Sequence, residues 1–175
     1  MEVHQDSPSS IHKVAEEHDQ LIAFAAFIEK RWIWVRNANR EKFLDGFPQI
    51  EVIKAEMTSP HSARARLRFP VKSNFCDMFG YMGTGFATTL GDIVTIHVTA
   101  SMLKRYDIKF VSVNIATHCV NLKPPGDKLD IFVETYDYNK NRAYSRAEFR
   151  RACDGLLLYT VTQMMKPLNP SPRLQ

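Results

Sequence analysis

The sequence predicts an α+β domain in which an antiparallel sheet wraps around one long, buried helix. Three observations lead to this expectation: two strand-like segments early in the chain, a glycine-rich turn that enters an almost wholly apolar helix, and four β-rich segments after it. At 175 residues the chain has the size of one domain with an N-terminal extension. We expect residues 1–47 to form a tail and helical extension, 48–169 the domain, and 170–175 a C-terminal tail.

The N-terminal extension begins with a polar, serine- and proline-containing stretch over residues 1–10. From residue 11 to about 34, apolar positions such as Val14, Leu21 and Ile28 alternate with charged ones at the spacing of an amphipathic helix. Its polar face is acidic as well as basic, so we expect this helix to pack on its own domain or on a partner subunit.

The domain itself begins with residues 49–57 and 63–70, two strands joined by a turn-forming cluster, which predict a hairpin. A helix is expected from about residue 83 to 103, and its apolar composition predicts that it is surrounded by other structure. The remaining segments predict an antiparallel meander of four strands, over residues 110–120, 129–138, 142–151 and 156–165.

Composition and charge limit the class of protein. No apolar run approaches the roughly 20 residues that span a bilayer, so no membrane span is expected. Cys76, Cys119 and Cys153 are odd in number and widely spaced, which favours reduced, buried thiols in the cytoplasm, with the mitochondrion as an alternative, and indicates no metal site. The formal charge of +4 fits solvated surface charge or a polyanionic ligand. Proteins that bind RNA through a sheet space aromatic and basic residues along their strands. This sequence lacks that pattern, so we expect no nucleic acid as a partner.

The glycine-rich turn and the helix after it carry the chemistry. Backbone N–H groups at a helix start can polarise a carbonyl group, and Asp92 lies nine residues beyond Gly83 among apolar neighbours. Burying an unpaired carboxylate costs several kcal/mol, so Asp92 should line a cavity, meet a partner or act as an acid or base. The alternative is an Asp that bonds to a neighbouring group for structural reasons. The combination favours acyl chemistry.

Residues 49–168 resemble the hotdog-fold acyl-CoA thioesterases, in particular the phenylacetate-type and thioesterase-superfamily members. In that family a loop asparagine precedes a His-Gly-Gly turn, an Ala-Thr-Leu-x-Asp helix and a Val-Ser-Val strand. The counterparts here are Asp77, Gly83-Thr84-Gly85, Thr88-Thr89-Leu90-Gly91-Asp92 and Val111-Ser112-Val113-Asn114. The asparagine, the histidine and the first glycine of the family pattern are therefore replaced.

The resemblance implies a hotdog fold and hydrolysis of acyl-CoA-type thioesters at a dimer interface. It assigns Asp92 to activate water or attack the thioester carbon, the backbone N–H of Thr84 to stabilise the oxyanion, and Ser112 to position the water or Asp92. Replacement of a side chain at Thr84 can leave a backbone donor intact. Asp77 has two open interpretations: it holds the loop or a water in place of an amide, or it shares a proton with Asp92.

The resemblance also implies coenzyme A as part of the substrate and no separate cofactor. Aromatic residues of the loop and helix would line the acyl pocket, and basic residues late in the chain would meet the phosphates of the nucleotide. The substrate-contacting set is Gly83, Gly85, Phe79, Tyr81, Phe86, Asn114, Lys140, Arg142 and Lys166.

Other functions fit the same fold. One is a non-catalytic acyl-binding or assembly protein, in which the replacements at Asp77, Gly83 and Thr84 reflect lost activity. Another is a thioesterase that releases a polyketide or acyl chain from a carrier protein. A dehydratase is disfavoured because Gly83 stands where a histidine would help. In each case we expect a homo-oligomer, either a dimer or a dimer of dimers.

Overall fold

The computed structural model describes residues 22–33, 49–102 and 109–168. The expected N-terminal stretch over residues 1–10 and the expected C-terminal tail over residues 170–175 both lie outside these ranges. The domain consists of six strands, one long helix and a short 3₁₀ helix: β1 (Glu51–Ser59), β2 (Ser62–Pro70), η1 (Ser73–Phe75), α2 (Thr84–Met102), β3 (Lys109–Cys119), β4 (Lys128–Tyr138), β5 (Ala143–Arg151) and β6 (Leu157–Leu168).

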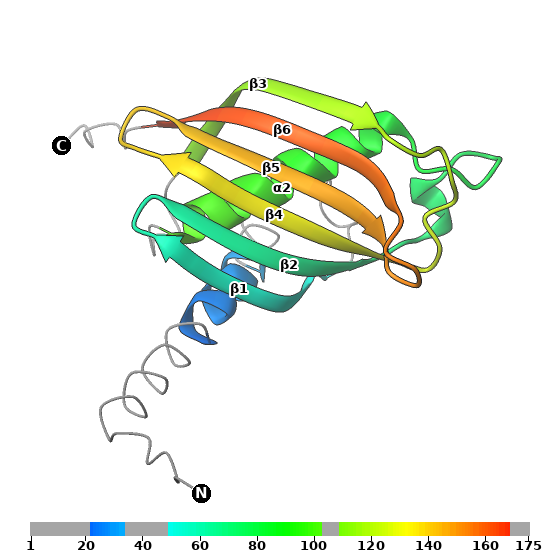
Figure 1. The fold of residues 1–175 in the computed structure, drawn as a ribbon, viewed down its shortest axis with the longest axis horizontal. Coiled ribbons are helices and arrows are strands. Elements are labelled where there is room, and N and C mark those ends of the chain that lie inside the picture. The colour runs from blue at the N-terminus through cyan, green and yellow to red at the C-terminus, as the bar shows by residue number, and fades with distance from the viewer. Residues whose placement is uncertain (1–21, 34–48, 103–108, 169–175) are drawn as a thin grey trace, which may run out of the picture.

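The six strands form one antiparallel sheet in the order β1-β2-β4-β5-β6-β3, as Figure 1 shows. The predicted meander is therefore wrong in one respect: β4, β5 and β6 follow one another, but β3 pairs with β6, and β4 pairs with β2. The link between β3 and β4 explains the difference. Val120 N–H donates to the carbonyl of Leu158 in β6, and at the other end Val71 N–H, just after β2, donates to the carbonyl of Asp127. This proline-containing link spans the end of the sheet instead of making a tight turn.

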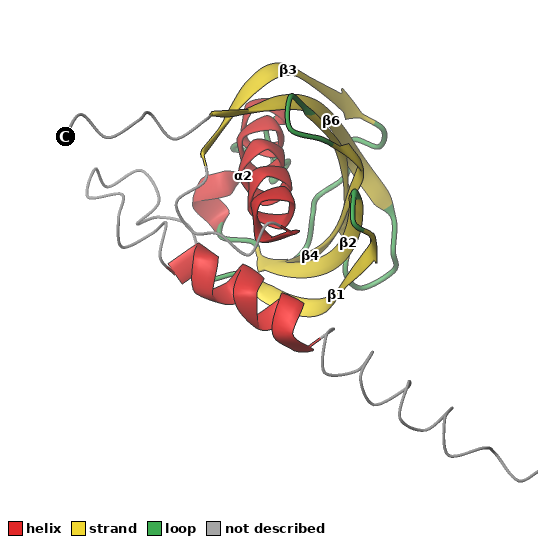
Figure 2. Cartoon of the chain, turned by 90° about the vertical axis from the view of Figure 1, so that its left-hand side faces the viewer, coloured by secondary structure: helices red, strands yellow, loops and turns green. Residues whose placement is uncertain are grey.

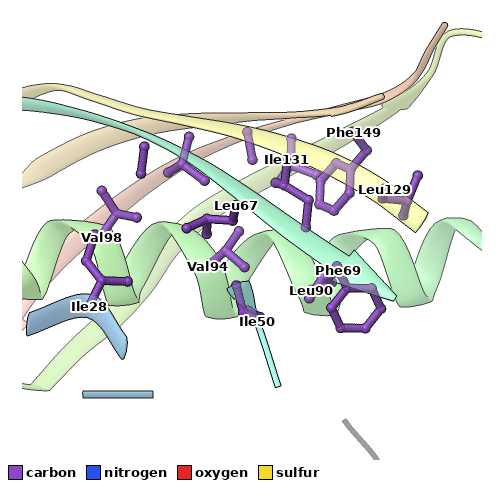
Figure 3. Close-up of a cluster of buried hydrophobic side chains, with 14 of the residues drawn as sticks. Ile28, Ile50, Leu67, Phe69, Leu90, Val94, Val98, Leu129, Ile131 and Phe149 are labelled. Atoms are coloured by element: carbon purple, nitrogen blue, oxygen red, sulfur yellow. The ribbon is translucent and has the colours of Figure 1, made fainter. Parts of the chain in front are cut away.

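Helix α2 lies in the hollow of the curved sheet (Figure 2), as predicted. Leu90, Val94 and Val98, each four residues apart, are fully buried and pack among sheet residues such as Leu67 and Ile131 (Figure 3). Burial of each such side chain contributes on the order of 1.5–3 kcal/mol. The predicted helix begins one residue earlier than α2, and residue 103, its predicted end, lies outside the described residues.

The close approach of α2 to β6 depends on one glycine. A Cβ atom added at Gly91 would lie 2.8 Å from both γ carbons of Val161, which is closer than real Cβ contacts. Any side chain at this position would push the helix away from β6. Gly91 therefore fixes the depth at which the next residue, Asp92, meets the sheet.

Residues 22–33 form a helix that packs beside β1 and against α2 (Figure 2). Phe24, Ile28 and Trp32 of this helix are buried, and the Trp32 ring lies 5.0 Å from the ring of His97. This part of the expected N-terminal helix thus packs on its own domain. The remainder, residues 11–21 and 34, lies outside the described residues.

The three cysteines are free, but the expectation that they are buried is wrong. Cys119 and Cys153 are exposed and Cys76 is half-buried. The reason is local: Cys119 ends the edge strand β3, and Cys153 lies in the turn between β5 and β6. Within the described ranges, none of the helices combines the length and apolar composition of a bilayer-spanning segment.

Candidate functional site

The loop before α2 is organised by the carboxylate of Asp77. Its Oδ1 accepts hydrogen bonds from the backbone N–H groups of Phe79 (2.9 Å) and Tyr81 (3.0 Å), and Asp77 N–H donates to the Tyr81 carbonyl (2.8 Å). Gly80 has φ of +80°, which favours glycine at the tip. Asp77 therefore holds the loop, as in the first interpretation of this residue. In the part of the chain that the structure describes, no hydrogen bond joins Asp77 to Asp92.

The start of α2 is anchored on one side and open on the other. The phenol of Tyr159 in β6 donates to the carbonyl of Met82, and Tyr159 is buried. Burial, reinforced by the nearby Cys119, raises the pKa of this phenol to about 12, so it remains a donor at neutral pH. On the other side, Gly83 and Gly85 are exposed and a Cβ atom added to either would meet nothing within 4 Å.

The first N–H groups of α2 have the character of an anion or oxyanion site. In an α-helix these groups have no carbonyl of their own helix to bind, and they carry the positive end of the helix dipole. The first turn of α2 contains no acidic residue to compensate them. Thr84, the first helical residue, is exposed. Its backbone N–H belongs to this group of uncompensated donors.

Asp92 lies eight residues after Thr84 in the same helix, in a cluster of neutral polar groups. Its Oδ1 accepts hydrogen bonds from the Ser112 hydroxyl and from the Gln163 side-chain amide. The Gln163 amide nitrogen also donates to Ser112 Oγ (2.6 Å), and the Thr95 hydroxyl donates to the Gln163 carbonyl oxygen. Among the described residues, no group is found bonded to Oδ2 of Asp92. Within this part of the chain, the carboxylate is thus held through one oxygen.

Three elements bring this cluster together. The residues that bond to Asp92 come from β3 and β6, which are neighbours in the sheet only because β3 pairs with β6. An irregularity in the register between Ser112 and Asn114 of β3 lies at the point where Ser112 meets Asp92. Gln163 is buried and lies between Val161 and Met165, both of which are buried.

Gln163 and Thr95 are site residues that the sequence analysis missed. Gln163 is separated from Asp92 by 71 residues, so no local spacing links the two. The available signal was a single amide on the inward-facing side of an otherwise apolar strand segment, where a buried polar group requires a partner. Tyr159 was also missed, because no local spacing links it to its partner Met82.

The two parts of the site do not meet within one chain. Asp92 and Thr84 are eight residues apart on the same helix, which corresponds to about 12 Å along its axis. The donors at the helix start and the acid are therefore too far apart to contact one reacting carbonyl group. A site that used both would need a second copy of one of them.

The predicted substrate-contacting residues divide into two groups. Phe86 stacks on Phe75 at 4.5 Å, and Tyr81 and the 72%-exposed Phe79 lie on the loop that Asp77 holds. These residues surround the helix start, together with Gly83 and Gly85.

The second group lies at the opposite end of the sheet. Thr99, in the last part of α2, bonds to Ser145 near the start of β5, so the preceding turn with Lys140 and Arg142 lies at the far end of α2 from Thr84. Arg142 lies over the Tyr144 ring at 5.3 Å, and Asn114 lines a pocket of about 330 Å³ with Tyr136 and Tyr144. Lys166 is opposite Val111 on the edge strand.

Metal ligands are not grouped in the described ranges: no three His, Cys, Asp or Glu side chains there are close enough to hold a metal ion.

Comparison with solved structures identifies the architecture. A thioesterase-family protein from Silicibacter pomeroyi superposes with a TM-score of 0.60 at 16% identity, covering 78% of this chain and 96% of that one. Zebra fish thioesterase superfamily member 2 gives 0.63 at 16% identity, covering 79% and 95%. A thioesterase from Staphylococcus aureus, solved as a Gln-to-Ala variant, gives 0.60 at 12% identity, covering 72% and 98%.

The sequence comparisons add no family to this result. No protein-family model matches the sequence, and no curated protein is significantly similar to it. The shared feature is the six-stranded antiparallel sheet around a central helix, which is the hotdog fold of these thioesterases.

Proposed function

We propose that the chain hydrolyses acyl-CoA-type thioesters and belongs with the hotdog-fold thioesterases. The observation that carries the proposal is the arrangement at Asp92, a half-buried carboxylate held by Ser112 and Gln163 through Oδ1, with no bond to Oδ2 from any described residue. The described groups that bond to this carboxylate are neutral donors that fix its orientation. The carboxylate is suited to accept a proton from water or to attack a carbonyl carbon itself.

The proposed reaction needs two subunits. Strand β3 is an edge strand, and its Val111 and Val113 are 47% and 57% exposed. If two copies pair antiparallel through β3, their α2 helices run in opposite directions, which carries the helix start of one copy toward Asp92 of the other. The same pairing moves that helix start toward the end of the sheet that carries Lys140 and Arg142, where the phosphates of coenzyme A would bind.

In the water-activating form of the reaction, Asp92 accepts a proton from a water molecule while the water oxygen bonds to the thioester carbon. The carbonyl oxygen becomes an oxyanion and accepts a hydrogen bond from the backbone N–H of Thr84 of the partner subunit. The tetrahedral intermediate then breaks its C–S bond, and the departing thiolate takes the proton from Asp92. The products are a free acid and a thiol.

A second candidate keeps the binding site but not the turnover. It is favoured by Asp77, whose carboxylate is already occupied with the backbone of its own loop, and by the open space at Gly83, where the family has a histidine. Such a protein would bind acyl thioesters without hydrolysing them. A carrier-protein-bound acyl chain is the alternative substrate for either candidate.

A thiol-release assay over a panel of acyl-CoAs tests the proposal. We expect hydrolysis by the parent protein and a loss of about 10²- to 10⁴-fold in kcat for Asp92→Asn, the range for removal of a general base. Asn keeps the shape of Asp and can still accept from Ser112, so the fold should be retained, as checked by circular dichroism. Asp77→Asn tests whether the family's amide improves turnover.

The outcomes separate the candidates. Saturable binding of acyl-CoA without thiol release across the panel would support the binding protein and overturn hydrolysis. Release from acyl-carrier substrates alone would identify the carrier-bound substrate. Equal activity in Asp92→Asn and the parent would remove Asp92 from the mechanism.

A further inference from the structure

A large groove in the described part of the chain lies on the face of the sheet that points away from α2. Its volume is about 760 Å³, within the size range of small-molecule sites, which is roughly 300–1,000 Å³. Strands β1, β2, β4 and β5 form it, because Arg64 and Arg66 of β2 alternate with the buried Ala63, Ala65 and Leu67 that face the core. The thioester site proposed above is on the other face.

An exposed aromatic ring occupies the middle of this groove. Phe132 of β4 is directly opposite Arg66 of β2 and Glu148 of β5 in the strand register, and it is 39% exposed. The guanidinium groups of Arg66 and Arg150 lie over the Phe132 ring at 5.3 Å and 5.9 Å from its centre. Ile53 of β1, also partly exposed, adds apolar surface to the lining.

The charges around Phe132 are unequal in number. On one side, Asp130 binds both Arg66 (2.6 Å) and Arg68 (2.9 Å). On the other side, Glu148 binds both Arg146 (2.7 Å) and Arg150 (2.7 Å). Each of these two triads contains two guanidinium groups and one carboxylate. Glu51 of β1 is opposite Arg68 in the strand register and adds a negative charge beside the first triad, so the excess positive charge lies at the Glu148 triad. The remaining pairs at the groove, Arg64–Glu134 and Lys54–Glu56, are neutral.

The triads also retain hydrogen-bonding capacity. A guanidinium group has five N–H donors, and a single shared carboxylate cannot satisfy ten of them. One donor illustrates this: Nε of Arg66 is buried and has no hydrogen-bond partner within the described residues. Two of these cationic groups, Arg66 and Arg150, flank an aromatic surface.

We propose that this groove binds a small organic anion with an aromatic or acyl body. The apolar body would lie on Phe132 and Ile53, and the anionic group or groups would accept hydrogen bonds from the arginines of the two triads. The site is separated from Asp92 by the thickness of the sheet, so it is an additional binding site and does not depend on thioester hydrolysis.

Titration with anilinonaphthalene sulfonate, an aromatic anion, tests the proposal. Binding is followed by fluorescence and located by amide chemical shifts in NMR spectra of the full chain. We expect one saturable site with shifts concentrated at residues 64–66, 132 and 148. The double variant Arg66→Gln with Arg150→Gln should bind at least about tenfold more weakly, which corresponds to roughly 1.4 kcal/mol.

Matched controls isolate the groove. Arg151→Gln makes the same change on the same strand, but Arg151 binds Asp154 in the β5–β6 turn, outside the groove, so its affinity should equal that of the parent. Phenylnaphthylamine, which lacks the sulfonate, should bind about tenfold more weakly than the anion. If the double variant does not fold, Phe132→Leu serves instead, because it keeps an apolar residue and removes only the ring.

Three results would overturn the proposal. One is equal affinity of the double variant and the parent, and another is a set of shifts confined to the loop before α2. The third is self-association that increases with protein concentration, is lost in the double variant and competes with the probe, because the groove would then be an interface with a second copy.

Discussion

Asp92 and Asp130 are two carboxylates on opposite sides of the same sheet, and they are held in different ways. Asp92 lies under the inner face and accepts hydrogen bonds from two neutral groups, Ser112 and Gln163, through one oxygen. Asp130 lies on the outer face and accepts from two guanidinium groups through both oxygens, at 2.6 Å from Arg66 and 2.9 Å and 3.2 Å from Arg68. Both are partly or wholly buried.

The difference shows how the environment selects the role of a carboxylate. Burial alone would raise the pKa of Asp130, but the hydrogen bonds and charges of Arg68 and Arg66 outweigh it and hold the pKa below its ordinary value. Asp130 is therefore a fixed anion whose oxygens are occupied, which suits a structural role. Asp92 is oriented by neutral donors and has no bond to its second oxygen from the described residues, which suits the role proposed for it. The predictions below test this distinction.

The largest effect is expected at a third buried titratable group, His97, which has no anionic partner in ranges 22–33, 49–102 and 109–168. Burial lowers its pKa from 6.5 to about 4, against the opposing hydrogen bond between its ring and the Ile93 carbonyl, and Arg31 lowers it further. Because the folded-state pKa lies below the unfolded value, protonation favours unfolding. The stability should be at its full value above pH 6.5 and fall by roughly 3 kcal/mol as the pH drops to about 4.

Urea denaturation between pH 7 and pH 4 measures this loss, and His97→Phe is the control. Other carboxylates also titrate in this interval, so the informative quantity is the difference between the two proteins. The variant should lose less stability than the parent as the pH falls. Parallel pH profiles would show that His97 does not contribute.

A smaller effect is expected from Asp130→Asn, which removes the anion between Arg66 and Arg68. Breaking a fully buried pair costs about 3–5 kcal/mol, and because these arginines are 41% and 29% exposed, we expect about 2 kcal/mol in the free energy of unfolding. Thioester hydrolysis should be unchanged. Asp154→Asn, which breaks the exposed pair with Arg151, should cost much less in the same urea titration. A loss of activity as large as that of Asp92→Asn would abolish the distinction between the two carboxylates.

The smallest effect is expected from Ser112→Ala, which removes one of the two donors to Asp92. A hydrogen bond to a charged group contributes about 1.5–3 kcal/mol, and since Gln163 remains, we expect about a tenfold loss in kcat with KM little changed. Ser101→Ala is the matched control, because the Ser101 hydroxyl donates to the His97 carbonyl at the other end of α2. Unchanged kcat in Ser112→Ala would mean that Gln163 alone orients Asp92.

Part of the candidate site could be predicted because it is local in sequence. The glycine-rich turn, the helix start at Thr84 and the position of Asp92 within α2 all lie within about ten residues, where helix periodicity applies. The contact between Asp92 and Ser112 was implied by resemblance alone. Gln163 could not be found in this way, because its only connection to Asp92 is the sheet.

The sequence by itself determined which segments are helix or strand, because side-chain periodicity depends on the backbone of each segment alone. Only the tertiary structure decided that β3 pairs with β6, and this pairing places Ser112 and Gln163 on the same side of Asp92. It also placed Arg66 and Arg150 on either side of Phe132. The physical reason is that strand order depends on how linking segments cross the sheet and on which faces become buried, and neither is encoded in a local pattern.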